Sequence, residues 1–139
     1  MSRARAYGRC LCGAVTYEVR GALRDVVDCH CHECSRWNGS VGAYAATPRG
    51  DLIVTGEALR WIASPASDRG ARRAFCSECG SSLFWDPEDG DLISIAAGTL
   101  DQPTGLRTIG HWYTHQAGDY YELPDDGLPR DGSRVTGAR

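Results

Sequence analysis

The chain has 139 residues and a formal net charge of −3. No segment approaches the ~20 consecutive apolar residues of a membrane-spanning helix. The fifteen basic residues, all arginine, are scattered rather than gathered into the basic patch that is typical of nucleic-acid-binding proteins. Composition and charge therefore argue against a membrane protein and against a nucleic-acid partner.

Short runs of strand-forming residues, separated by turn residues, recur along the chain. In Ala14–Val19, the side chains of Val15, Tyr17 and Val19 share one face. Further strands are expected at residues 25–28, 41–47, 51–55, 58–63, 72–76, 81–85, 91–97 and 106–113. Glycine or proline occupies several of the gaps, which suits β-turns rather than helical crossovers. The pattern predicts a mainly β fold.

One short helix is predicted between the second and third of these strands. It runs from His32 or Glu33 to Trp37. Asn38-Gly39 is expected to end it, because glycine readily adopts the left-handed conformation that terminates helices.

Neither an internal repeat nor a linker is detectable, and the length suits one domain with its own core. We therefore expect a single domain over residues 1–139, with a core at about 7–129. The C-terminal tail, 130–139, is expected to be flexible.

The seven cysteines fall into three tight groups. These are Cys10-Leu-Cys12, Cys29-His-Cys31-His-Glu-Cys34 and Cys76-Ser-Glu-Cys79. Such spacings put two sulfurs on one side of a turn, where both can bind one tetrahedral zinc ion. Disulfides between such near neighbours would be strained, and an odd count leaves one thiol unpaired. The N-terminal stretch also lacks the apolar segment of a signal peptide, so we expect metal-binding thiols in a reducing cytoplasm.

The cysteines can be divided between two zinc ions. Cys29, Cys31 and Cys34 lie within six residues and can bind one side of a single ion, which leaves a fourth position open as in catalytic zinc sites. The other four form a closed, structural site: Cys10, Cys12, Cys76 and Cys79. Spacing alone is equally compatible with a second structural zinc, closed at the three-cysteine site by a distant His or Asp.

Other candidate residues have ordinary structural roles as their favoured interpretation. His30 alternates away from the neighbouring sulfurs and is expected to pack or to form hydrogen bonds. His111 and His115 are candidates for long-range chemistry, although a core or surface role is favoured for each. The four tryptophans, Trp37, Trp61, Trp85 and Trp112, are expected in the core rather than around a pocket. The acidic run 86–91 is interpreted as a solvated turn.

The order and spacing of three motifs resemble those of the glutathione-dependent formaldehyde-activating enzyme family. The motifs are Gly8-Arg-Cys10-Leu-Cys12-Gly13-Ala-Val15-x-Tyr17, Cys29-His-Cys31-x-x-Cys34-x-Arg36-x-x-Gly39-Ser40 and Phe75-Cys76-x-x-Cys79-Gly80-Ser81-x-Leu83. The resemblance extends over nearly the whole chain, from about Tyr7 to Pro129.

The resemblance implies a β-tent fold with two Zn²⁺ ions, a structural one on the four-cysteine set and a catalytic one on Cys29, Cys31 and Cys34. It also implies a carbon–sulfur lyase activity, with a small-molecule thiol such as glutathione and a small aldehyde as partners. In the family reaction, glutathione and formaldehyde condense to S-hydroxymethylglutathione. Arg36, just past the third cysteine, could bind a substrate carboxylate with its planar fork. An ion pair that fixes the loop is an equally favoured role for it.

Two departures from the family pattern bear on the substrate. Ser35 stands where a second basic residue is common, and His115-Gln116 stands where a lysine is frequent. Both changes remove positive charge near the expected anionic thiol. The alternative function is a non-catalytic, zinc-stapled binding module that recognises a protein or a small thiol through the same cleft.

Overall fold

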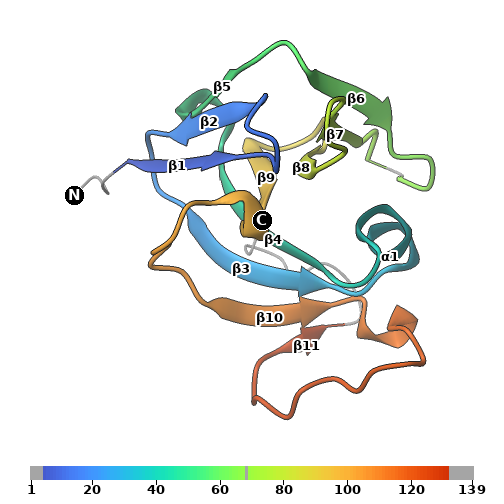
Figure 1. Cartoon of the computed structure of the whole chain (residues 1–139). Helices are drawn as coiled ribbons and strands as arrows, with labels where there is room; N and C mark the ends of the chain where they lie inside the picture. The colour runs from blue at the N-terminus through green and yellow to red at the C-terminus, as the bar shows by residue number, and fades with distance from the viewer. Residues whose placement is uncertain (1–4, 68, 132–139) are drawn as a thin grey trace.

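Two β-sheets make up the computed structural model, which describes residues 5–67 and 69–131. The smaller sheet has the order β1-β2-β5, with β1 at Ala6–Arg9, β2 at Thr16–Val19 and β5 at Leu52–Thr55. The larger sheet has eight strands in the order β11-β10-β3-β4-β9-β8-β7-β6 (Figure 1). Its strands are β3 (Arg24–Cys29), β4 (Gly42–Pro48), β6 (Leu59–Ala63), β7 (Arg72–Cys76), β8 (Ser82–Asp86), β9 (Leu92–Ala96), β10 (Thr108–Trp112) and β11 (Arg130–Asp131).

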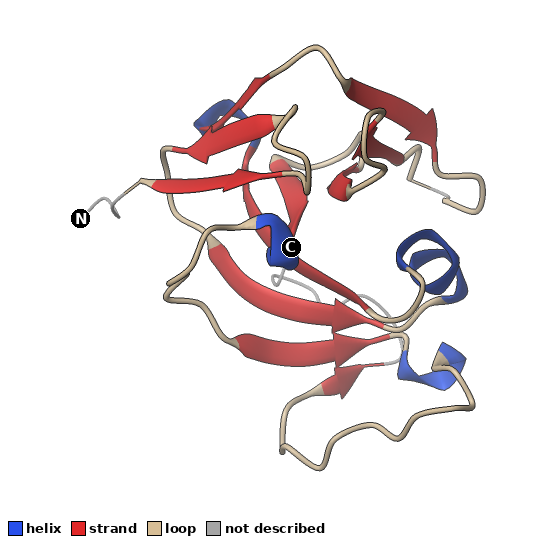
Figure 2. Cartoon of the chain, in the orientation of Figure 1, coloured by secondary structure: helices blue, strands red, loops and turns tan. Residues whose placement is uncertain are grey.

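Helical structure is confined to short segments (Figure 2). The α-helix α1 spans His32–Asn38 and ends at Gly39, whose φ of 88° is the left-handed conformation predicted for this position. Three single-turn 3₁₀ helices lie at Arg49–Asp51, Ala97–Thr99 and Thr114–Gln116.

Strands β3 and β10 run parallel, whereas the other pairs from β3 to β6 are antiparallel. Parallel strands end at the same edge of a sheet, so the register brings Trp112 opposite Cys29 at the end of both strands. Helix α1 begins three residues after β3 and lies beside this edge (Figure 1). The topology thus places the Cys29–Cys34 segment next to the end of β10.

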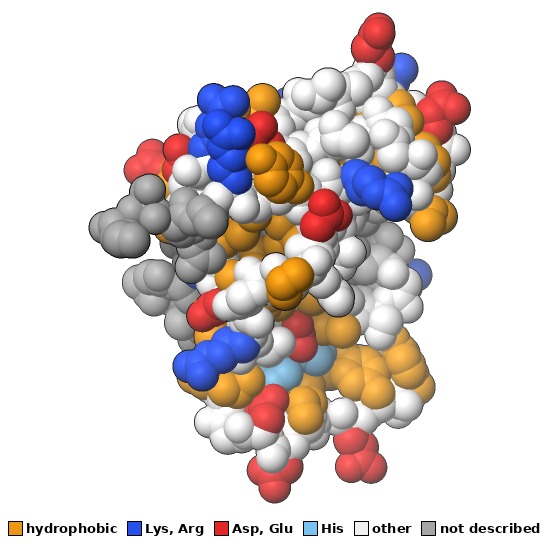
Figure 3. Space-filling model, turned by 60° about the vertical axis from the view of Figure 1, so that its left-hand side comes forward, with side chains coloured by type: hydrophobic (Ala, Val, Ile, Leu, Met, Phe, Trp, Pro, Cys, Tyr) orange, Lys and Arg blue, Asp and Glu red, His pale blue; other side chains and the backbone are white. Residues whose placement is uncertain are grey.

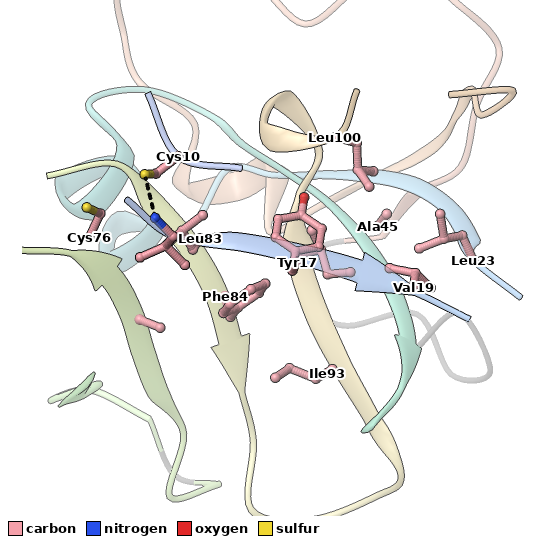
Figure 4. Packing of buried hydrophobic residues seen from close by; sticks show 13 residues of the cluster. Cys10, Tyr17, Val19, Leu23, Ala45, Cys76, Leu83, Phe84, Ile93 and Leu100 are labelled. Atoms are coloured by element: carbon pink, nitrogen blue, oxygen red, sulfur yellow. Dashed lines mark hydrogen bonds between the residues drawn. The ribbon is translucent and has the colours of Figure 1, made fainter. Parts of the chain in front are cut away.

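The main hydrophobic core lies between the two sheets (Figure 4). The buried residues come from both sheets and their connections: Cys10, Val15, Tyr17, Val19, Leu23, Ala45, Ala74, Cys76, Leu83, Phe84, Ile93, Ile95 and Leu100. Tyr17 and Phe84 meet edge to face with ring centroids 5.3 Å apart, which joins β2 to β8. This packing covers one face of the larger sheet and leaves its other face for α1.

The predicted mainly β fold in one small domain with cysteine clusters is confirmed. The expected strands all occur within two residues of their expected bounds, whereas β1 and the two-residue β11 were not predicted. The expected tail is untested from residue 132 onward, because residues 132–139 lie outside the described part of the chain.

No helix among the described residues combines the length and apolar character needed to cross a membrane. On the face shown in Figure 3, arginine side chains are separated from one another and interspersed with acidic ones.

Candidate metal centres and active site

Four cysteines from distant parts of the chain meet at the edge of the core. Cys10 and Cys12 follow β1, Cys76 ends β7, and Cys79 lies in the turn before β8. The four sulfurs lie within 4.8 Å of one another. Cys12 Sγ is 3.7 Å from Cys10 Sγ and 3.8 Å from Cys76 Sγ. The two turns predicted to share an ion are therefore adjacent, with a donor set that suits tetrahedral zinc.

Hydrogen bonds around this cluster favour thiolates. The backbone N–H of Val15 donates to Cys10 Sγ at 3.3 Å, the bond dashed in Figure 4, and that of Ala14 donates to Cys12 Sγ at 3.4 Å. The hydroxyl of Ser81, 3.2 Å from Cys79 Sγ, lowers the pKa of Cys79 to about 5. Donors aimed at sulfur stabilise the charged form that binds metal.

The second cluster forms around the start of α1. Cys29 ends β3, Cys31 is the N-cap residue of α1, and Cys34 lies in its first turn. The three sulfurs lie within 4.8 Å of one another, and the backbone N–H of Cys34 donates to Cys31 Sγ at 3.3 Å. Contacts with the other two thiols and burial raise the pKa of Cys29, because three adjacent thiolates repel one another. A divalent cation would remove this repulsion, so the donor set fits a metal ion.

No fourth His, Cys, Asp or Glu joins this cluster in the described part of the chain. The interspersed His30 instead points into a buried hydrogen-bond chain, as the alternation predicted. Its Nδ1 lies 2.7 Å from the Tyr121 hydroxyl, and its Nε2 lies 3.2 Å from Nδ1 of the buried His111. His111 Nε2 in turn lies 2.8 Å from an Asp126 carboxylate oxygen. His115 is exposed.

A close approach of α1 to β4 fixes the position of Cys34. Gly42 begins β4, and a Cβ atom at this residue would lie 2.7 Å from both Asn38 Nδ2 and Tyr44 Cε2, and 3.4 Å from Cys34 Cβ. Only glycine leaves room for this contact. The Asn38 amide then bridges the helix to the sheet, donating to the Cys34 carbonyl and the Tyr44 hydroxyl, each at 3.0 Å.

A cavity of about 380 Å³ opens beside the three sulfurs. Its lining residues are Cys29, Cys31, His32, Glu33, Cys34, Tyr44, Ala66, Ser67, Arg69, Arg73, Trp85, Trp112, Tyr113 and Gln116. They come from β3, β4, β7, β8, β10 and α1, from the connections between β3 and α1 and between β6 and β7, and from the segment after β10 with its 3₁₀ helix. The volume falls in the range of small-molecule sites.

Strand alternation places the cavity and the core on opposite faces of the larger sheet. In β4, Tyr44 lines the cavity while Ala45 packs in the core. In β7, Arg73 lines the cavity while Ala74 packs in the core. Each of these strands thus contributes one residue to the cavity and the next to the core.

The tryptophans divide between packing and the cavity. Trp112 is 2% exposed, as expected for a core residue, but it also lines the cavity, and so does Trp85. Tyr113 completes this aromatic wall with a φ of 57°, a conformation that residues other than glycine seldom adopt. The expectation that all four tryptophans serve only the core was therefore wrong for two of them.

The arginines near the cavity differ from the one singled out in the sequence. Arg36 is exposed and does not line the cavity, so its role in carboxylate binding stays a prediction. Arg69 and Arg73 do line it. Arg69 pairs with Asp89 and lies over the Trp85 ring, with its Cζ 5.4 Å from the ring centroid. Alternation in β7 was the available signal for Arg73, but it required knowing which face carries the cavity.

The fold and the two clusters define a class of small, cysteine-rich β domains whose clusters could each hold a metal ion. Residues 5–116 match the family described as glutathione-dependent formaldehyde-activating enzyme, and the chain belongs to this family. A crystal structure of a Rhodobacter sphaeroides protein is similar in fold, with a TM-score of 0.55 and 24% sequence identity over 89% of this chain and 98% of that one. No curated protein gives a significant match.

Proposed function

We propose that the protein is a zinc-dependent carbon–sulfur lyase-type enzyme that joins a small thiol to a small aldehyde. Glutathione and formaldehyde, the pair in the family description, are the first substrates to test. The observation that carries the proposal is the position of three clustered cysteine sulfurs in the wall of a cavity of about 380 Å³. A metal held by three protein ligands keeps a position for substrate.

The two clusters would hold ions with different roles. Cys10, Cys12, Cys76 and Cys79 would hold a structural zinc, and Cys29, Cys31 and Cys34 a catalytic one. When bound at the latter, zinc supplies a positive charge that keeps a coordinated thiol deprotonated. Seven unpaired thiols among the described residues support a reducing, cytoplasmic setting.

The side chains of the cavity supply orientation and a proton. Trp85, Trp112 and Tyr113 form an aromatic wall that excludes water from the reacting groups. The Tyr44 hydroxyl accepts hydrogen bonds from Asn38 and Arg73, so its own O–H remains to donate to a bound molecule. Formation of the carbon–sulfur bond converts the aldehyde carbonyl oxygen to a hydroxyl, and Tyr44 Oη would deliver that proton. The proton that the substrate thiol loses replaces the one that Tyr44 donates, so the number of protons balances over the reaction.

Turnover can be tested by exchange NMR of glutathione with ¹³C-formaldehyde. We expect the zinc-loaded protein to accelerate formation of S-hydroxymethylglutathione above the spontaneous rate, and Cys31→Ala to abolish the acceleration. Binding of glutathione without acceleration would instead favour the zinc-stapled binding module. Thiols with fewer charges should be tested beside glutathione, because Ser35 and His115-Gln116 stand where the family resemblance implies basic residues.

The proposed role of Arg36 in binding a substrate carboxylate can be tested against the same role for Arg69. Arg69 lines the cavity and Arg36 does not. If Arg36 binds the substrate, Arg36→Gln should raise the KM for an anionic thiol and leave the KM for an uncharged thiol unchanged. The same pattern in Arg69→Gln alone would transfer the role to Arg69.

A further inference from the structure

A buried guanidinium lies directly beside the three-cysteine cluster. The Arg73 side chain is 3% exposed, and its Nη2 lies 3.7 Å from Cys34 Sγ and 3.3 Å from Glu33 Oε1. Its Nε donates to Ser64 Oγ at 3.0 Å and its Nη1 to the Tyr44 hydroxyl at 3.4 Å. Each nitrogen therefore has a partner, and together the contacts hold the planar fork against the sulfur.

The anchoring contacts are themselves fixed. Glu33 accepts from the Ser64 hydroxyl and, at 2.7 Å, from the backbone N–H of Ala66. These contacts tie the first turn of α1 to the connection between β6 and β7. Arg73 consequently cannot leave Cys34 without breaking a network of side-chain and backbone hydrogen bonds.

Arg73 lies between two sources of negative charge, Glu33 and the cysteine sulfurs. Glu33 supplies one negative charge beside the guanidinium, and burying the cation carries a desolvation penalty that further negative charge at the sulfurs reduces. A divalent ion with three thiolates has a net charge of −1, as two positive and three negative charges sum. A cation at this distance stabilises such a site.

We propose that Arg73 is a positioning residue of the three-cysteine site, where its hydrogen bond to Cys34 Sγ balances the charge of the metal–thiolate cluster. The proposal rests on the proposed function only in requiring a divalent metal at this site. It makes the Cys34 sulfur a weaker electron donor than it would be without this contact, because a donated hydrogen bond withdraws charge from a thiolate ligand. A fourth, substrate thiolate would then meet less negative charge at the ion.

Cobalt binding tests this without any turnover. We expect Arg73→Gln to weaken binding of the second cobalt ion by about 10–100-fold, as is typical when an outer partner of a metal ligand is removed. The sulfur-to-cobalt charge-transfer band of this site should also move to lower energy, because the sulfur regains electron density. The band of the four-cysteine site serves as the internal reference and should not move.

Two matched variants separate charge balance from simple structural support. Arg72→Gln removes the neighbouring arginine, whose side chain is 51% exposed and stacks over Trp61, and it should change neither affinity nor band. Glu33→Gln removes the ion pair that holds α1 but leaves the contact between Arg73 and Cys34. It should therefore retain most of the band energy of the unmodified protein.

An Arg73→Gln band at its original energy would overturn the proposal, as would a Glu33→Gln variant with the same shift and loss of affinity. If Arg73→Gln does not fold, Arg73→Leu provides the same measurement, because leucine fills part of the buried space and removes both the charge and the hydrogen bond to Cys34 Sγ. An unshifted band in folded Arg73→Leu would equally refute it. If the unmodified protein shows no turnover with glutathione, these spectra can still be interpreted. The two proposals can therefore fail separately.

Discussion

The two cysteine clusters lie on opposite faces of the same sheet and are assembled in different ways. The four-cysteine cluster joins two turns that are more than sixty residues apart, with Cys12 and Cys76 at 64 residues' separation. The three-cysteine cluster comes from one local segment, Cys29–Cys34, beside a cavity. A metal that links distant segments stabilises the fold, whereas a metal held by one segment is free to serve chemistry. The two different roles proposed for the clusters follow from this difference in topology.

The largest expected effect comes from breaking the long-range cluster. Cys76→Ala should unfold the domain, because it removes a ligand from a site whose metal contributes on the order of 10 kcal/mol to folding in small metal-dependent domains. Cys31→Ala should leave a folded but inactive protein, because the ligands of the three-cysteine site are already close to one another in the sequence. Circular dichroism melts of the two zinc-loaded variants measure the difference. Equal losses of melting temperature would contradict the division of roles.

Metal removal should separate the clusters next. We expect about two zinc ions per chain, one lost rapidly to a chelator and one retained until the protein unfolds. The rapid phase should disappear in Cys31→Ala, which identifies its origin. Metal analysis combined with chelator kinetics gives both quantities. A single zinc in the reduced protein, or one uniform phase in the intact chain, would argue against an open and a closed site.

A smaller and more local effect is expected at the contact between α1 and β4. Gly42→Ala places a Cβ atom 2.7 Å from Asn38 Nδ2 and Tyr44 Cε2, so α1 must shift and carry Cys34 with it. We expect a loss of about 1–3 kcal/mol in the free energy of unfolding and weaker binding of the rapidly lost metal. Gly50→Ala is the matched control, because no atom lies within 4 Å of its added Cβ. Similar metal binding in both variants would show that this contact does not position Cys34.

The contrast between local and long-range contacts also explains how much of the structure could be predicted from the sequence. Both clusters and α1 were predictable, because ligand spacing and a terminal glycine are local signals, and the motif order identified the family. The cavity was not, because Arg73, Trp85 and Tyr113 become neighbours only through the order of the eight-stranded sheet. The surroundings of Asp86 could not be predicted for the same reason.

Asp86 was expected in a solvated turn, yet it is 7% exposed. Its carboxylate accepts from Arg49 at 2.8 Å and from Arg72 at 3.3 Å. These arginines lie directly after β4 and in β7, so the ion pairs depend on the arrangement of strands and not on the acidic run itself.

The smallest expected effect concerns the hydrogen bond between Asp126 and His111, and it depends on pH. The carboxylate of Asp126 accepts hydrogen bonds from His111 and from the backbone N–H of Leu128, which hold the pKa of Asp126 below its ordinary value. A carboxyl group whose pKa is lowered by folding contributes stability above its unfolded pKa, about 3.9, and loses it as the pH falls through the folded pKa. Asp126→Asn should therefore lower the melting temperature slightly at pH 7, and its difference from the unmodified protein should shrink as the pH falls below about 5. Melts across the pH range in which the zinc-loaded protein stays folded, with Asp125→Asn as control, test this. A difference that does not shrink at the lowest of these pH values would mean that the contact stabilises the fold without its charge.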